Sequence, residues 1–370
     1  MRPPSRRAIS AASGLAAISL ITALPASATM AGDRAAGIRT ARPGAALPAA
    51  TLTGVAATST RNAWAVGYTG PPEPVILHWN GTRWARVRLP ALAGGGLLNA
   101  VAATSATNAW AVGFTHGDQN LILHWNGTRW TRVIPGRRTG ELYGITATSR
   151  TSAWAVGTLA PGSVPGGLMV LHWNGRTWRR VPCPNPTGSG SLAGVSARSS
   201  SDAWAVGYTG IQGIILHWNG TSWKRSTVRL PRDGNPISAV DATSAGNAWA
   251  AGLSSYGLSL ILRWNGTAWK HYQAPRPTLG GGLAAVTATS AKNAWAVGSG
   301  SNGAASFTWI FRWNGRTWAR VPSPRGAIRG ALLAITATSA TNAWAVGYHG
   351  FIAGPALILH WNGTAWTPVT

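Results

Sequence analysis

The chain has 370 residues, of which 45% are hydrophobic and 11% are charged, and its formal net charge is +25. This length suits one large domain or two ordinary ones, and the single cysteine, Cys183, excludes an internal disulfide. Because only seven carboxylates face 32 basic side chains, we expect the surface to attract anionic polymers such as nucleic acid, acidic polysaccharide, cell-wall polymers or lipid headgroups.

Residues 1–28 have the pattern of a secretory signal peptide. Three arginines make a basic start, an apolar run covers residues 8–24, and Ala26-Ser27-Ala28 provides a small-x-small cleavage site. The apolar run is too short for a membrane span. The sequence therefore predicts a soluble, secreted protein cleaved near Ala28, with either the general secretory or the twin-arginine route left open.

Residues 29–50 are rich in alanine, proline, glycine and arginine. They show no periodic apolar positions, so this segment is predicted to be a flexible leader to the folded part.

From residue 51 to the end, the chain repeats one pattern seven times, and each copy carries three tryptophans. Self-similarity with this period indicates a repeat architecture. The remaining tryptophan, Trp309, takes the place of an aliphatic residue in an apolar run and is expected in the core. The triplets are Trp64, Trp79 and Trp84; Trp110, Trp125 and Trp130; Trp154, Trp173 and Trp178; Trp204, Trp218 and Trp223; Trp249, Trp264 and Trp269; Trp295, Trp313 and Trp318; and Trp344, Trp361 and Trp366.

Each copy divides into four short apolar runs bounded by turn residues, which is typical of β-strands. In the second copy these runs are Leu98–Ser105, Ala109–Gly113, Leu121–Trp125 and Trp130–Val133. Four strands per copy and seven copies predict an all-β fold, a seven-bladed β-propeller with four antiparallel strands per blade, spanning residues 51–370. The strict repetition of the tryptophans predicts that they pack between blades and do not bind ligand.

Every copy contains Trp-Asn-Gly between its third and fourth runs. Asn-Gly is a strong hairpin signal, because both residues tolerate positive φ. We therefore expect a tight turn flanked by two tryptophans on neighbouring strands.

The second-strand motif Ala-Trp-Ala-Val-Gly, followed later by Trp-Asn-Gly-x-x-Trp, resembles the blades of tectonin-type lectins. It is also similar to the Asp-box propellers, which include sialidases and sortilin-like proteins. Asn174–Trp178 and Asn314–Trp318 are nearest to that box, although they lack its serine and aspartate and the turn is one residue shorter. The resemblance implies a propeller. The arginine triad, tyrosine nucleophile and carboxylate of sialidases have no match here.

Loop lengths predict two different faces. The interval from the first-strand Val or Ile to the second-strand tryptophan is nine residues in all copies, and the interval across Asn-Gly is five. The other two connections vary, from 11 to 16 residues and from 12 to 14. We call the side with constant connections the turn face and the other side the loop face. Because variable loops on a rigid scaffold usually carry recognition, we expect the binding site on the loop face.

On the loop face, aromatic rings lie beside polar groups, which suits carbohydrate, because apolar sugar faces stack on rings and hydroxyls need partners. The candidate ligand-binding residues are Tyr68, Phe114, His116, Asp118, Asn120, Glu141, Tyr208, Asp233, Tyr348 and His349.

Five arginines follow the last tryptophan of a triplet by two residues and should form a basic belt on the outermost strands. Charge there protects an edge strand from pairing with another sheet, and the same belt can contact a polyanion. These rim residues are Arg86, Arg132, Arg180, Arg225 and Arg320.

The sequence gives little support for a catalytic site or a metal site. Five third-strand histidines occupy equivalent positions in different blades and so cannot converge on one ion. Only Glu73, Asp118 and Glu141 offer carboxylates for cleaving a glycosidic bond. We therefore predict a monomeric, non-catalytic protein without metal or cofactor that binds carbohydrate or a cell-wall polymer. The alternatives are a cell-surface interaction scaffold, a polyanion binder and a glycan-cleaving enzyme.

Two structural questions remain open in the sequence. Cys183 is either an incidental loop residue or one half of an intermolecular bridge. The ring closes either by strand exchange or by packing alone, and packing is favoured because Leu52 and Val369 fall at blade boundaries.

Overall fold

The computed structural model describes most of the repeat region, within the compact unit Ala46–Thr370. The predicted signal peptide and nearly all of the predicted leader lie outside the described residues. Described are residues 47, 49–70, 72–92, 94–135, 140–159, 166–230, 235–253, 257–275, 280–350 and 354–369.

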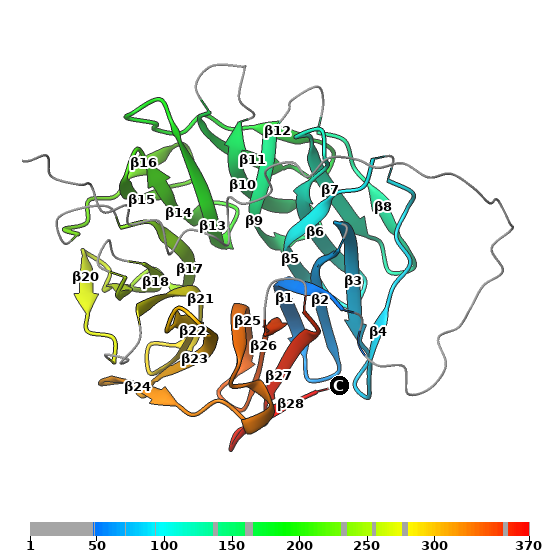
Figure 1. The fold of residues 1–370 in the computed structure, drawn as a ribbon. Coiled ribbons are helices and arrows are strands. Elements are labelled where there is room, and N and C mark those ends of the chain that lie inside the picture. Colours follow the sequence, from blue (N-terminus) through cyan, green and yellow to red (C-terminus); the bar gives the residue numbers. More distant parts are fainter. Residues whose placement is uncertain are drawn as a thin grey trace, which may run out of the picture. The chain divides into compact units, whose positions relative to one another are not determined.

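Seven four-stranded antiparallel sheets surround a central axis, and each sheet is built from four consecutive strands (Figure 1). The seven-bladed propeller predicted from the repeats is thereby confirmed. The first strand of each blade is innermost and the fourth is outermost. The first four blades comprise β1 (Thr51–Ser59), β2 (Asn62–Thr69), β3 (Glu73–Trp79) and β4 (Trp84–Arg86); β5 (Leu97–Ser105), β6 (Asn108–Phe114), β7 (Asn120–Trp125) and β8 (Trp130–Arg132); β9 (Gly140–Ser149), β10 (Ser152–Leu159), β11 (Leu168–Trp173) and β12 (Trp178–Arg180); and β13 (Gly190–Ser199), β14 (Asp202–Thr209), β15 (Gln212–Trp218) and β16 (Trp223–Arg225). The last three comprise β17 (Ile237–Ser244), β18 (Asn247–Leu253), β19 (Ser259–Trp264) and β20 (Trp269–Tyr272); β21 (Gly280–Ser290), β22 (Asn293–Ser301), β23 (Ser306–Trp313) and β24 (Trp318–Val321); and β25 (Gly330–Ser339), β26 (Asn342–His349), β27 (Ala356–Trp361) and β28 (Trp366–Pro368).

Among the described residues the one helical element is a short 3-10 turn, η1 (Arg325–Ala327). None of the helices in the described part is long and apolar enough to cross a membrane.

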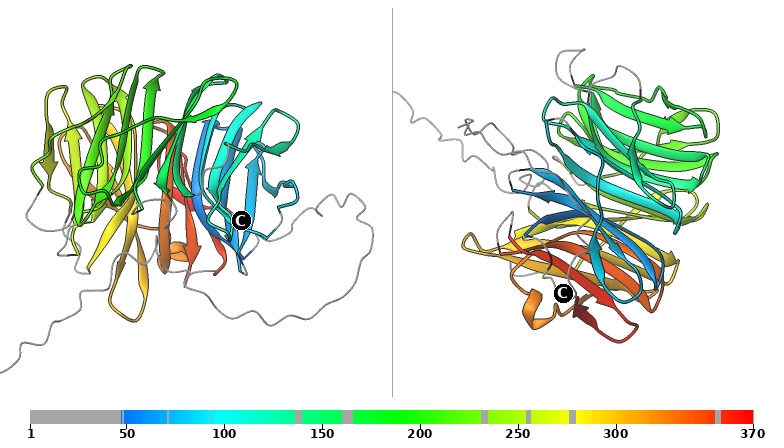
Figure 2. Two further views of the ribbon diagram at one scale, coloured as in Figure 1. Left: turned by 90° about the horizontal axis from the view of Figure 1, so that it is seen from above. Right: turned by 90° about the vertical axis from the view of Figure 1, so that its right-hand side faces the viewer.

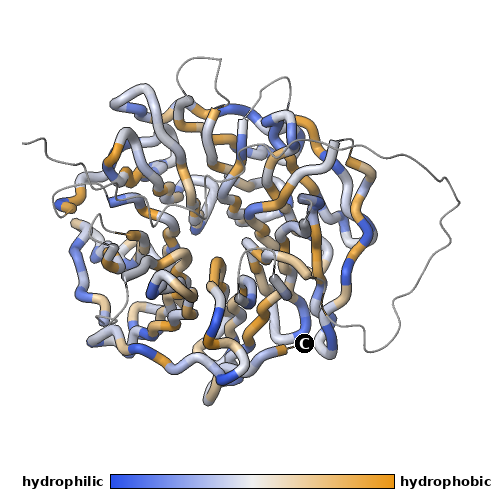
Figure 3. The backbone as a smooth tube through the Cα atoms, in the orientation of Figure 1, coloured by the Kyte–Doolittle hydropathy of each residue, from blue (hydrophilic) through white to orange (hydrophobic). Residues whose placement is uncertain are grey.

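Hydrophobic residues occur in every blade around the ring (Figure 3). They form seven separate clusters, each shared by two neighbouring blades. The cluster between the first two blades joins Trp64, Val66 and Ile76 to Leu98 and Trp130, among others. A single blade cannot bury both of its faces, so the hydrophobic stabilisation resides in these joints.

The tryptophan triplets build all seven joints in the same way. In the joint between the first two blades, the ring of Trp64 lies 5.1 Å from that of Trp125 and 5.2 Å from that of Trp130, in tilted and edge-to-face contact. The second-strand tryptophans are at most 3% exposed. The predicted packing between blades is confirmed.

Among the residues that the structure describes, the ring closes by packing and without strand exchange. The first blade consists only of β1–β4 and the last only of β25–β28. Trp344 contacts Trp79 and Trp84 at 5.1 and 5.2 Å, which repeats the geometry of the internal joints. Ala49 and Pro355 add an isolated bridge across this joint. The preference for closure by packing is confirmed.

The Asn-Gly loops differ from the expected turn. At Asn80-Gly81 only the glycine has a positive φ, of 98°, and the same holds for the other copies. Asn80 instead uses its side chain, because its Oδ1 accepts the backbone N–H groups of Thr82 and Arg83 at 3.0 Å. The two tryptophans flank the connection on neighbouring strands as predicted, since Trp79 pairs with Trp84, but the connection is a four-residue loop held by the asparagine side chain.

Trp309 is 1% exposed and stacks on Phe311 at 6.1 Å, which confirms its predicted place in the core.

Candidate functional site

The turn face and the loop face predicted from the loop lengths are the two opposite sides of the ring. In the edge-on view of Figure 2 the strands run between them. On the turn face, a Cβ added at Gly81 would lie 3.1 Å from the Cβ of Arg61, so the turn after a first strand touches the loop after a third strand. On the loop face, the Gly140 N–H donates to the Asp118 carbonyl at 2.8 Å and ties a β2–β3-type loop to the next blade.

Aromatic and acidic residues meet on the loop face of the second to fourth blades. The ring of Phe114, at the end of β6, lies 6.4 Å from that of Tyr143 in β9, edge to face. The Tyr143 hydroxyl donates to Glu141 Oε2. Burial raises the pKa of Tyr143, and the Glu141 hydrogen bond and the nearby charges of Glu141, Tyr208 and Asp118 raise it further. Tyr143 is therefore a neutral donor at physiological pH.

Asp118 presents its side chain at the edge of this group. It is exposed, and among the described residues it is the one non-glycine residue with a positive φ, 52°. Aspartate tolerates this conformation in turns. Here the backbone bond to Gly140 places the residue beside Glu141. We call Phe114, Asp118, Glu141, Tyr143 and Tyr208 the mouth cluster.

Sequence reasoning named four of these five residues and missed Tyr143. The available signal was a departure from the repeat, because the equivalent first-strand positions hold Thr53, Asn99, Ala193, Ser238, Ala284 and Leu333.

The other candidate ligand-binding residues lie elsewhere. Tyr68 and Tyr348 form a pair across the closing joint; burial raises both pKa values, and Tyr68 raises that of Tyr348 further. His349 ends β26 beside this pair. His116 is exposed and its Nδ1 contacts the Gly94 carbonyl.

Two candidates cannot be placed with the mouth cluster. Asn120 is only 5% exposed, and its amide nitrogen lies 3.9 Å from the Met169 sulfur, so burial removes it from the contact residues. Asp233 lies outside the described residues.

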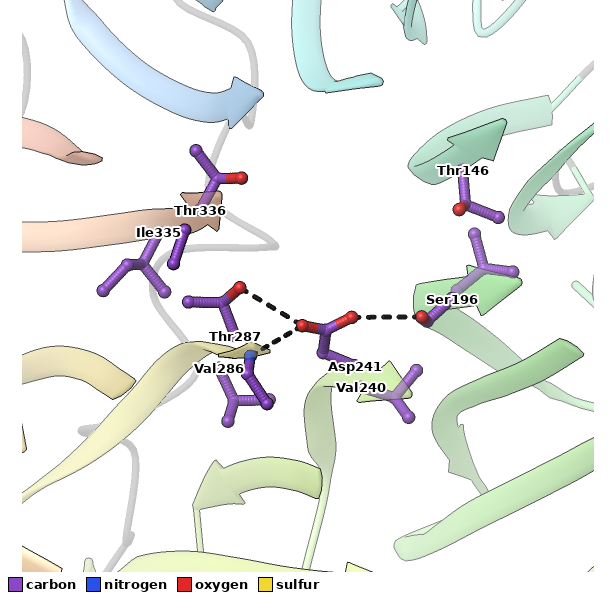
Figure 4. A pocket seen from close by; sticks show the side chains of 11 residues that line it. Thr146, Ser196, Val240, Asp241, Val286, Thr287, Ile335 and Thr336 are labelled. Atoms are coloured by element: carbon purple, nitrogen blue, oxygen red, sulfur yellow. Dashed lines mark hydrogen bonds between the residues drawn. The ribbon is translucent and has the colours of Figure 1, made fainter. Parts of the chain in front are cut away.

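A cavity of about 330 Å³ lies in the central channel, lined by the innermost strands of the third to seventh blades (Figure 4). Its polar groups come from the residue that pairs with the second-strand tryptophan in each blade. This position holds Thr146, Ser196, Asp241, Thr287 and Thr336, but alanine in the first two blades. Sequence reasoning did not single out this ring, although Asp241 breaks the repeat.

The carboxylate of Asp241 accepts several hydrogen bonds. Ser196 Oγ donates to its Oδ1 at 3.2 Å, and Thr287 Oγ1 and the Ala288 N–H donate to its Oδ2 at 3.2 and 2.7 Å. These bonds connect three neighbouring first strands, whose edges do not pair with one another. Burial raises the pKa of Asp241, and the hydrogen bonds only partly offset this effect. We assign the carboxylate a structural role.

The raised pKa gives a testable pH dependence. Folded Asp241 binds its proton more tightly than the unfolded residue, so its contribution to the free energy of unfolding falls as pH rises from about 4 through the folded-state pKa. Asp241→Asn removes the titration and keeps an acceptor for Ala288. We expect the melting temperature of this variant, relative to the wild type, to rise between pH 4 and pH 7. A difference that is constant with pH in thermal denaturation would contradict the assignment.

The rim arginines lie on the outermost strands as predicted. Arg86 pairs with Leu77, Arg180 with Leu171 and Arg320 with Phe311. Four of the five are exposed and Arg132 is partly buried. In the described part of the chain, the ion pairs join Asp202 to Arg198 and His217, and none involves the rim.

The third-strand histidines are part of the joints. His78 stacks on Trp64 at 4.1 Å and its Nε2 lies 2.9 Å from Asn62 Oδ1. Burial lowers its pKa, so the neutral ring is favoured. In the fifth and sixth blades Arg263 and Arg312 stack on the tryptophans instead. Within the described residues no three His, Cys, Asp or Glu side chains gather as a metal site.

Cys183 is partly buried against the joint between the third and fourth blades. Burial raises the pKa of its thiol to about 11, and the opposing effect of the Arg180 charge does not cancel this rise. The thiol is therefore protonated and unreactive at neutral pH.

Comparisons with known proteins show which solved structures have a similar fold. Neither the known family models nor the curated protein sequences contain a match. Among solved structures, YCF48 bound to a D1 peptide is 15% identical, with a TM-score of 0.59 over 85% of this chain and 94% of that one. The BP39L lectin from Burkholderia pseudomallei is 12% identical, with a TM-score of 0.59 over 88% of this chain and all of that one.

A third neighbour is an enzyme. The GH74 xyloglucanase from Xanthomonas campestris is 14% identical, with a TM-score of 0.59 over 87% of this chain and 53% of that one. At these identities the similarity shows the fold alone. By its fold the chain is a seven-bladed β-propeller, similar to lectin and peptide-binding propellers.

Proposed function

We propose that the protein binds carbohydrate, without cleaving it, through the mouth cluster on the loop face. The observation that carries the proposal is the grouping of three aromatic rings and two carboxylates from three blades in one place. Rings can stack on the apolar face of a sugar, while Glu141 and Asp118 accept hydrogen bonds from its hydroxyl groups and Tyr143 orients Glu141.

The distribution of apolar groups also favours the loop face. Among the described residues the exposed large hydrophobic side chains are Ile134, Ile211, Leu258 and Ile328. All four lie in connections on the loop-face side. The turn face has none of them.

A peptide is the second candidate ligand, supported by one specific observation: the similar propeller YCF48 is bound to a peptide. An extended peptide would use the same mixture of aromatic and acidic side chains. A partner that binds through the rim arginines instead would be a polyanion, with affinity that falls steeply with salt.

Catalysis finds less support. An acid–base pair needs two carboxylates facing one bond. Of the two carboxylates in the mouth cluster, Glu141 is engaged by Tyr143 and Asp118 is exposed to solvent. Glu73 lies at the exposed start of β3 in a different blade. We therefore propose a non-enzymatic role, despite the fold similarity to a xyloglucanase.

We further propose that the protein is exported after removal of residues 1–28, which the basic start, apolar run and cleavage site support. A carbohydrate or an anionic polymer of the cell envelope would then be within its reach, and the protein would act as a monomer.

A glycan array at physiological salt tests the proposal. We expect binding to a restricted set of glycans, retained when salt is doubled, because stacking and hydrogen bonds are screened less than surface charges. The same samples, assayed for released sugar, should show no cleavage. An array without any ligand, or ligands lost completely on raising the salt, would contradict the proposal.

A further inference from the structure

The turn face has an unusual charge. It consists of the seven turns between first and second strands and the seven loops between third and fourth strands, and every residue in them is described. These fourteen connections contain no acidic residue. They contain seven basic residues, all exposed: Arg61, Arg83, Arg129, Arg150, Arg176, Lys292 and Arg316.

Carboxylates lie away from these charges. The carboxylate that directly follows a turn-face connection is Asp202, at the start of β14, and it is already paired with Arg198 and His217. The other described carboxylates are Glu73, Asp118 and Glu141 on the loop-face side and Asp241 in the channel. Basic charge on the turn face is therefore not neutralised within the described protein.

The turn face is also regular and rigid. Each turn after a first strand has the same length in all blades, as has each loop after a third strand. Asparagine side chains hold the loops, as at Asn126, whose Oδ1 accepts the backbone N–H groups of Thr128 and Arg129 at 3.0 Å. Connections of equal length around a ring end at about the same level, so the seven cations lie on one side of the ring.

Partly exposed tryptophans lie just beneath this surface. Trp79, Trp125 and Trp173 end third strands at the turn face and remain only partly buried. Each donates its indole N–H at 3.0 Å to a backbone carbonyl in the neighbouring turn. Amphipathic rings next to basic side chains are typical of surfaces at the headgroup level of a bilayer.

We propose that the turn face docks onto a bilayer that contains anionic lipids. A planar anionic surface can meet all seven cations at once, because they are spread over four blades on one side of the ring, whereas a linear polymer would meet only those along its path. Each basic residue held near an anionic bilayer adds to the attraction, and the effect decays within about 10 Å at moderate salt. Docking in this orientation leaves the loop face, with the mouth cluster, directed away from the lipid.

Vesicle co-sedimentation of the full chain tests this docking. The vesicles are phosphatidylcholine with or without phosphatidylglycerol, and the phosphatidylcholine vesicles measure any binding by the apolar N-terminal run. The test variant is Arg61→Gln/Arg83→Gln/Arg129→Gln on the turn face. The matched control is Arg88→Gln/Arg229→Gln/Arg329→Gln, which removes three exposed arginines from the connections leading to the loop face and lowers the net charge equally.

We expect wild type and control to bind phosphatidylglycerol vesicles alike, and the turn-face variant to bind about a hundredfold more weakly at low salt. Melting temperatures of both variants should match the wild type, because all six side chains are exposed. Equal losses in the two variants would show attraction by net charge alone and overturn the proposal. Binding that is independent of phosphatidylglycerol would overturn it as well.

Discussion

Trp344→Ala is expected to lower the free energy of unfolding by about 3–5 kcal/mol, the range observed for removing a large buried aromatic side chain. Trp344 is fully buried and makes the closing joint with Trp79 and Trp84. In the described part of the chain no strand exchange joins the first and last blades and one isolated bridge links Ala49 to Pro355, so this joint depends mainly on side-chain packing. Chemical denaturation monitored by tryptophan fluorescence and circular dichroism measures the effect.

Trp110→Ala is the matched control, because Trp110 makes an internal joint of the same geometry with Trp173 and Trp178. We expect similar losses in both variants. A Trp344 variant that is nearly as stable as the wild type would contradict closure by packing, since the first and last blades would then be held by something else.

Tyr143→Ala is expected to weaken binding to the best glycan of the array by about a hundredfold, the size of a hot-spot effect of 2–3 kcal/mol. It removes a ring that contacts Phe114 and the donor that orients Glu141. Tyr143→Phe keeps the ring and should cost about tenfold, through the lost hydrogen bond to a charged group. Isothermal titration calorimetry measures both.

Tyr348→Ala provides the control for this series. Tyr348 is a loop-face tyrosine in a second strand, β26, equivalent to Tyr208 in its own blade, but it lies beside Tyr68, away from the mouth cluster. We expect its affinity for the glycan to change by less than about threefold, as for a residue outside the contact area. Equal losses in the Tyr143 and Tyr348 variants would place the ligand elsewhere or indicate unfolding.

The fold could be predicted because the sequence repeats the pattern of one blade seven times. The tryptophan triplets fix the joints, and constant and variable connections separate the two faces. A repeat, however, predicts only what its copies share. It could not show that the asparagine of each Asn-Gly holds its loop by a side chain, since this depends on φ values that the residue types leave open.

The candidate site was only partly predictable for the same reason. Phe114, Asp118, Glu141 and Tyr208 could be assigned to the loop face, but their grouping depends on how three blades meet. Tyr143 and Asp241 lie in first strands, where the pattern favours a core or channel position, and their roles follow only from neighbours in other blades. Asn120 was assigned to the binding surface because it lies beside a variable loop, but that position does not reveal that its side chain is buried.

The most direct measurement is a crystal structure of the protein with the tightest glycan from the array. The account predicts a sugar ring against Phe114 and Tyr143, with hydroxyls at the Glu141 and Asp118 carboxylates. A sugar bound at the third-strand tryptophans, on the turn face or only along the rim arginines would contradict it.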